Sequence, residues 1–140
     1  MATLTKLGPA QHGVRLSDDE FRASDYEPGF RYELIDGRLF VSPEADLAED
    51  MIVNWLLTSL MRFHLHHSEI INYVTQRARV FVPYRLGTTC PQPDLSAYAN
   101  VPFELPPNEL GWEDLEPLLV VEVMTGDAWK DLDRNTKLYL

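Results

Sequence analysis

Two carboxylates interrupt apolar stretches of the sequence where a buried strand is expected. Glu122 stands within Leu-Leu-Val-Val-Glu-Val-Met at residues 118–124, and all the remaining side chains of this segment are apolar. Asp94 follows Pro93 and opens another strand-like segment at 94–98. A carboxylate buried in a strand costs several kcal/mol unless it is paired or binds a cation. Something must therefore compensate Glu122, and a metal ion held jointly with Asp94 is the sharpest hypothesis.

A cation bound by these two carboxylates would favour phosphoester chemistry. Alternate side chains of a strand share a face, so Glu122 lies on the same side of its strand as Val120 and Met124. Two oxygen ligands on neighbouring strands suit a hard cation such as Mg²⁺ or Mn²⁺, with water and a substrate phosphate completing the coordination. The bound ion would polarise a phosphodiester and lower the pKa of the attacking water. Taken alone, however, Asp94 is more typical of a turn that starts a strand.

Charged residues elsewhere complete the candidate site. Glu33 lies in a strand of the first hairpin, where a solvated position is the simpler interpretation. A helix predicted from about Asp127 to the end carries Lys130 and Lys137, and with Arg134 these fall at i, i+4 and i+7 on one face. One basic face directed at the acidic cluster would stabilise charge on a phosphate. The spacing leaves open which lysine acts, and also whether this face is only solvated.

Local patterns predict the first elements of the chain. Ser17-Asp-Asp-Glu has the spacing of a capping box and predicts a short helix through Ala23. Asp36-Gly37, between residues 30–35 and 38–41, predicts a β-hairpin with a two-residue turn. Glu33 would lie in the first strand of this hairpin.

A long helix and several strands are predicted after the hairpin. The helix begins after Asp46 or Pro43 and ends near His66. Its apolar stripe is formed by Ile52, Leu56, Leu60 and Phe63. Strands are predicted at residues 69–75, 77–82, 94–98 and 118–123, and the last has the composition of a strand buried on both faces. Residues 100–117, rich in proline and acidic residues, are expected to form a surface excursion.

The order of elements predicts an α/β (α+β) protein with a central mixed sheet flanked by helices. The 140 residues suffice for one domain, expected over residues 16–140 after a loosely ordered lead-in at 1–15. The net charge of −10 excludes a generally basic surface for nucleic acid, so any phosphate-binding patch must be local. A single cysteine, Cys90, excludes an internal disulfide and suits a reducing compartment. Without an apolar signal core or a membrane-spanning segment, the sequence predicts a cytoplasmic protein with no membrane contact.

Four motifs in order resemble the bacterial Uma family of restriction endonucleases, within the PD-(D/E)xK nuclease superfamily. They are Tyr-Glu-Leu-Ile-Asp-Gly-Arg-Leu at 32–39, Gln-Pro-Asp-Leu-Ser-Ala-Tyr at 92–98, Pro-Leu-Leu-Val-Val-Glu-Val-Met at 117–124 and the Asp/Lys/Tyr-bearing helix after them. The similarity runs from about Leu16 to the C-terminus. It implies a restriction-endonuclease-like core and a Mg²⁺-dependent (or Mn²⁺-dependent) endonuclease acting on DNA. It also implies that Asp94 and Glu122 are the metal ligands and that Glu33 assists them.

The sequence departs from the family pattern at three places. The superfamily lysine, two residues after the acid, is replaced by Met124; the Uma family has it on the following helix, where Asp133 to Lys137 fits the spacing and Lys130 is the alternative. Family members often carry a histidine at the start of the long helix, where this chain has Glu49 or Asp50. Family members also continue beyond the final helix, which predicts here a domain truncated at its C-terminus, without its last strands.

Three functions are therefore compatible with the sequence. The first is a DNA endonuclease, active or degenerate, whose uncovered sheet edge would favour a homodimer. The second is a non-catalytic remnant or interaction module with the same fold. The third is a metal-dependent hydrolase of a small phosphoester, which suits a charge of −10 better than duplex DNA does.

Overall fold

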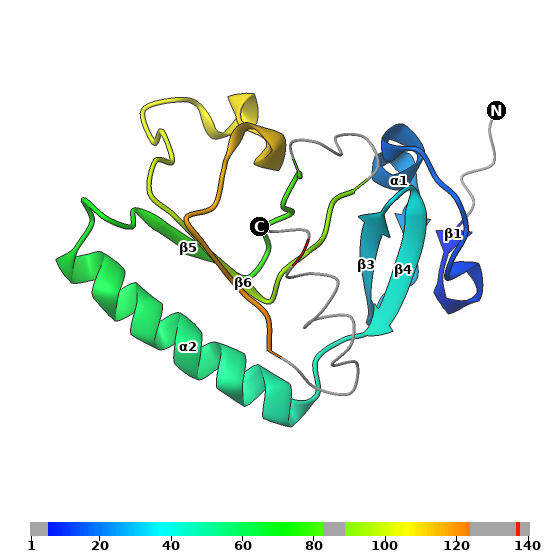
Figure 1. Ribbon diagram of the computed structural model, residues 1–140, viewed down its shortest axis with the longest axis horizontal. Coiled ribbons are helices and arrows are strands. Elements are labelled where there is room, and N and C mark those ends of the chain that lie inside the picture. Colours follow the sequence, from blue (N-terminus) through cyan, green and yellow to red (C-terminus); the bar gives the residue numbers. More distant parts are fainter. Residues whose placement is uncertain (1–5, 83–88, 124–136, 138–140) are drawn as a thin grey trace. The chain divides into compact units, whose positions relative to one another are not determined.

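The chain contains both helices and strands, as predicted for a mixed α/β protein (Figure 1). The computed structural model describes residues 6–82, 89–123 and 137. The chain divides into two units, the first formed by residues 1–44 and 81–91 and the second by residues 45–80 and 92–140. The described strands belong to three small sheets rather than to one continuous central sheet. One of these sheets is a parallel pair, and the other two are antiparallel.

The centre of the first unit is the predicted hairpin, β3 (Phe30–Ile35) and β4 (Arg38–Pro43). Its turn residues Asp36 and Gly37 have φ values of 50° and 71°. Positive φ at both positions defines the two-residue turn that matches the twist of a hairpin, and glycine and aspartate tolerate it best. The backbone N–H of Asp36 also donates to Thr89 Oγ1 at 3.1 Å, which ties the turn to a distant part of the chain.

The helix α1 (Asp18–Ala23) begins as its capping box predicts. Ser17 Oγ accepts the backbone N–H of Glu20 at 3.2 Å, and the Glu20 carboxylate accepts that of Ser17 at 2.8 Å. These bonds from Ser17 lower the pKa of Glu20 because they favour its charged form. Both unpaired donors at the helix start are thereby satisfied.

Residues 6–11, in the described part of the expected lead-in, include two short regular elements. They form β1 (Lys6–Leu7), which pairs in parallel with β2 (Asp25–Tyr26), and the 3₁₀ helix η1 (Pro9–Gln11). Leu7 is buried in the apolar core of the first unit. The other buried members of that core are Phe21, Tyr32, Leu34, Leu39 and Cys90.

The second unit packs one long helix on one face of a three-stranded sheet (Figure 1). The helix α2 (Leu47–His66) is capped by Asp46, whose carboxylate accepts the N–H of Glu49 at 2.8 Å. The sheet has the order β5 (Tyr73–Thr75), β6 (Leu95–Tyr98) and β7 (Leu119–Val121), all antiparallel. The core between helix and sheet is formed by Ile71, Val74, Leu95 and Ala97 with Leu56, Leu57, Leu60 and Val121.

The predicted apolar stripe of α2 is half right. Leu56 and Leu60 pack on the sheet, but Ile52 and Phe63 are 49% and 40% exposed. The packed face is instead centred on Val53, Leu56, Leu57 and Leu60. The buried face of the helix therefore starts at residue 53, one residue later than predicted. It continues at the i+3, i+4 and i+7 positions from that residue.

Two predicted strands are wrong in extent. Residues 69–72 form a turn before the short β5, and residues 77–82 are not a strand, although Ala78, Val80 and Val82 are buried alternately as predicted. Strand β7 is not buried on both faces, since Leu119 is 39% exposed and only one face packs on α2.

The predicted surface excursion between β6 and β7 is confirmed. It contains the 3₁₀ helices η3 (Pro107–Glu109) and η4 (Trp112–Asp114). Apart from Lys137, the predicted C-terminal helix lies outside the described residues. Among the helices that the structure describes, none is long and apolar enough to cross a bilayer.

Candidate functional site

Asp94 and Glu122 come together at one end of the antiparallel pair β6 and β7. Leu95 pairs with Val121, Ser96 with Val120 and Ala97 with Leu119. One more step in this register sets Asp94 opposite Glu122. Directly opposite residues of an antiparallel pair have Cβ atoms about 4.5–5.5 Å apart. Continued by one step beyond the Leu95–Val121 pair, this register would bring the two predicted ligands within reach of one ion.

A hydrogen bond fixes Asp94 beside Glu122. Asp94 Oδ2 accepts the backbone N–H of Val123, the residue after Glu122, at 2.6 Å. The Asp94 side chain is buried, with an exposed fraction of 8%, whereas Glu122 is half-buried. A carboxylate accepts at about four lone-pair positions. The bond to the backbone therefore orients the Asp94 carboxylate at this end of β6 and β7.

The two acids lie on the sheet face that points away from α2. Leu95 and Ala97 of β6 pack toward α2, and alternation places Asp94, Ser96 and Tyr98 on the opposite face. Glu122 alternates in the same way with Val121, which also packs toward α2. Its carboxylate is thus kept out of the apolar core. This placement explains how the strand accommodates a charge that the sequence suggested would be fully buried.

Two buried hydroxyl groups follow Asp94 on this face. Ser96 Oγ and Tyr98 Oη are buried, and neither makes a hydrogen bond with a partner among the described residues. Burial raises the pKa of Tyr98 to about 12, and the nearby Ser96 side chain opposes part of that shift. The Tyr98 phenol therefore stays neutral at physiological pH.

Tyr98→Phe is expected to make the protein more resistant to alkaline unfolding. The pKa of Tyr98 is raised from 10.0 to about 12, so stability due to its neutral form is intact below pH 10 and lost as the pH rises through 12. The loss amounts to at most about 3 kcal/mol, and phenylalanine does not titrate. Thermal melts of both proteins across this pH range measure the difference in their alkaline loss of stability. Tyr32, whose pKa is also raised, is present in both proteins, so its effect cancels. The same alkaline loss in both would contradict the assignment.

The donor set of this end of the sheet fits a magnesium ion. Magnesium is held by one or two carboxylates and retains several waters, and Asp94 with Glu122 supplies two carboxylates from adjacent strands. Within residues 6–82, 89–123 and 137, no group of three or more His, Cys, Asp or Glu side chains is arranged to hold a metal. A two-carboxylate site therefore suits Mg²⁺ or Mn²⁺ better than the nitrogen and sulfur sites typical of zinc.

Glu33 belongs to the first unit and is buried, with an exposed fraction of 1%. It pairs across the hairpin with Phe40. Its neighbours Tyr32 and Leu34 face the apolar core, so alternation turns Glu33 to the other face of the hairpin. The simpler interpretation of Glu33 as a solvated hairpin residue is therefore wrong. Its role in catalysis stays a prediction.

The two candidate lysines stay predictions as well. Lys137 is exposed at a helical position. Lys130 lies outside the described residues, as does Arg134, so their common basic face is a property of the sequence pattern only.

One buried carboxylate was not among the candidates from sequence. Glu49, in the first turn of α2, has an exposed fraction of 7%. It precedes the buried Val53 by four residues and so lies on the packed face of the helix. Tracing that face back from Val53 by one turn would have identified it.

The family comparison decides the class of the protein. Residues 18–140 match the model of the Uma2 family, described as "Putative restriction endonuclease". The chain belongs to this family. The Uma2 match covers Glu33, Asp94 and Glu122 and confirms the resemblance found in the sequence motifs, together with a fold of the restriction-endonuclease type. Among curated proteins, no match to the Uma2 chain was found.

Proposed function

We propose that this Uma2 protein is a metal-dependent endonuclease that hydrolyses phosphodiester bonds in DNA. The observation that carries the proposal is the hydrogen bond from the Val123 N–H to Asp94, which ties Asp94 to the residue after Glu122, just beyond the Leu95–Val121 pair. Both residues belong to the second unit and to one sheet face. Asp94 and Glu122 are proposed as the ligands of Mg²⁺ or Mn²⁺.

Each residue of the proposed site has a separate task. A cation bound there supplies Lewis acidity toward the phosphodiester and a lower pKa for the attacking water. Asp94 and Glu122 hold and orient it, and the Val123 N–H keeps Asp94 in place. We assign Glu33 an assisting role, and Lys130 or Lys137 the stabilisation of negative charge that develops on the phosphate.

The environment of the reaction is part of the proposal. The single cysteine, Cys90, is buried and in no disulfide, which suits the reducing cytoplasm that we propose as the location of the protein. We also propose a homodimer, in which a second copy covers the outer edge of β7, a strand that pairs on its other side with β6. A monomer in sedimentation analysis at micromolar concentration would overturn the dimer but not the endonuclease.

Titration with metal tests the site directly. Isothermal calorimetry with Mg²⁺ or Mn²⁺ is expected to show one weak site, which is lost in Asp94→Ala and in Glu122→Gln. Asp114→Asn is the matched control, because Asp114, in the excursion between β6 and β7, also accepts one backbone N–H, that of Gly111 at 2.8 Å. Unchanged binding in both site variants would overturn the assignment of these ligands.

A second candidate function is favoured by the net charge of −10. A hydrolase of small phosphoesters would need no extended basic surface, whereas DNA binding through phosphates falls steeply with salt. Salt-sensitive binding of an oligonucleotide supports the endonuclease. Hydrolysis of a small phosphoester with no oligonucleotide binding would support the alternative, and intact folding with neither activity would indicate a degenerate, non-catalytic relative.

A further inference from the structure

An aromatic cluster lies on the same sheet face as the proposed metal site. We define it as Tyr73, Tyr98, Phe103 and Trp112. The ring centroids of Tyr73 and Tyr98 are 6.4 Å apart, those of Tyr73 and Phe103 are 6.0 Å apart, and those of Tyr98 and Trp112 are 6.1 Å apart. These separations fall within the range of favourable aromatic pairs. Strands β5 and β6 and the excursion between β6 and β7 thus contribute rings to one continuous cluster.

The outer ring of the cluster is exposed although its loop is held in place. Phe103 is 64% exposed and Tyr73 is 36% exposed, whereas Tyr98 beneath them is buried. The Asn72 side chain donates to the carbonyl of Val101 at 2.9 Å and accepts its N–H at 3.1 Å. The N–H of Phe103 then donates back to the same carbonyl at 3.1 Å. An apolar ring is therefore presented to solvent by a fastened turn, which lowers the entropy cost of binding a flat ligand on it.

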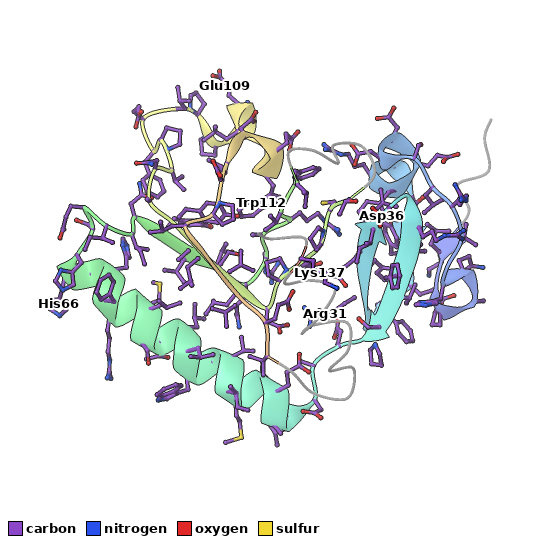
Figure 2. All side chains as sticks on the ribbon, viewed as in Figure 1. Arg31, Asp36, His66, Glu109, Trp112 and Lys137 are labelled. Atoms are coloured by element: carbon purple, nitrogen blue, oxygen red, sulfur yellow. The ribbon has the colours of Figure 1, made fainter. Side chains whose placement is uncertain are left out.

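The cluster and the acids occupy opposite ends of one strand face. Tyr98 and Asp94 are both on the face of β6 that points away from α2, and Figure 2 shows Trp112 on this side of the sheet. Four residues of strand at about 3.4 Å each separate them by roughly 14 Å. At about 3.4 Å per nucleotide of a stacked strand, this span corresponds to about four nucleotides.

The chemistry of the cluster suits the flat face of a nucleobase. Aromatic side chains that bind single strands do so by stacking on successive bases, without regard to sequence. In a duplex these base faces are occupied by the neighbouring pairs, so only unpaired nucleotides can use such a platform. Stacking also provides affinity that does not depend on neutralising phosphates. A chain of net charge −10 has little positive charge with which to neutralise them.

We propose that the exposed Phe103 ring is a stacking platform for an unpaired nucleobase, held by Tyr73, whose ring lies at 70° to it, with Tyr98 and Trp112 continuing the cluster behind Tyr73. It rests on the endonuclease function proposed above and specifies its substrate: single-stranded or locally unpaired DNA, bound with a base on the platform about four nucleotides from the bond that is cut. Intact duplex is a poor ligand for this surface.

Binding without metal tests the platform apart from catalysis. The probe is a fluorescently labelled oligothymidylate of about 12 nucleotides, long enough for the spacing of about four nucleotides, measured by anisotropy in EDTA. Phe103→Ala is expected to weaken binding by about 5-fold to 150-fold, the range that corresponds to loss of one stacked base. Phe103→Trp is expected to retain affinity. Leu105→Ala is the matched control, since Leu105 is also an exposed apolar residue of this loop, at 43%, but has no ring.

The outcomes separate the platform from the endonuclease. Equal binding by wild type and Phe103→Ala, or equal loss in Leu105→Ala, would overturn the platform even if the protein cleaves DNA with Mg²⁺. Duplex of the same length binding as tightly as the single strand would also overturn it. Ring-dependent binding of the single strand supports the platform even where no cleavage follows, and that result would count against the endonuclease alone.

Discussion

Replacing Asp94 by asparagine is expected to lower the rate of DNA cleavage in Mg²⁺ by about 10³-fold or more, equivalent to about 4 kcal/mol of activation free energy. Asparagine keeps the shape of the side chain and an oxygen that can still accept the Val123 N–H. It removes the negative charge that a divalent cation requires. The substitution therefore tests the metal site with little disturbance of the strands, and initial rates on a labelled oligonucleotide measure it.

Two further proteins make this result interpretable. Glu122→Gln is expected to lose activity to a similar degree, because it removes the proposed partner carboxylate, which directly follows β7. Asp114→Asn is expected to cleave as the wild type does, since it loses the same charge and keeps the same kind of backbone bond. Full activity in both Asp94→Asn and Glu122→Gln would show that the two acids hold no essential metal, whatever the family membership suggests.

Loss of the lysine proposed to act in catalysis is expected to have the second largest effect. Lys130→Ala or Lys137→Ala should lower cleavage by about 10²-fold, as removal of one electrostatic stabiliser commonly does. The metal affinity measured by calorimetry should survive, because neither lysine is proposed as a ligand. This combination distinguishes a residue that stabilises charge on the phosphate from one that supports the site as a whole.

The third lysine of the chain provides the control for this experiment. Lys6 is exposed on β1 in the first unit, and Lys6→Ala is expected to leave cleavage unchanged. The double variant Lys130→Ala, Lys137→Ala tests whether one lysine takes over the role of the other when only one is removed. If both single variants and the double variant kept full activity, the proposed role of Lys130 and Lys137 in catalysis would be wrong.

Local chemistry allowed several elements to be predicted from sequence alone. The capping box at Ser17 and the Asp36-Gly37 turn each depend on contacts within a few residues, and both were found where expected. The end of α2 near His66 was also predicted, and Asp46 proved to be the cap out of the two starts, Asp46 and Pro43, that the sequence left open. Its rotation did not, because apolar residues occur around much of the helix and only the sheet determines which of them are buried.

Long-range pairing accounts for what could not be predicted. Alternating burial at Ala78, Val80 and Val82 imitates a strand, yet those residues have no ladder partner among the described strands. Asp94 and Glu122 could be paired as candidates because each interrupts an apolar run. The aromatic cluster could not, since its rings come from three segments that meet only when β5, β6 and the excursion are folded.

The turn of the hairpin also has a consequence for the order in which the chain can fold. Asp36 bonds Thr89 across 53 residues, and Leu34 forms a bridge with Cys90. Contacts so distant along the chain are slow to form, because the intervening loop must close first. Because the hairpin precedes Thr89 and Cys90 in the sequence, it emerges from the ribosome well before the segment that pairs with Leu34. Neither unit is one continuous stretch of chain, so neither can be cut out as a single fragment that retains all of its own contacts.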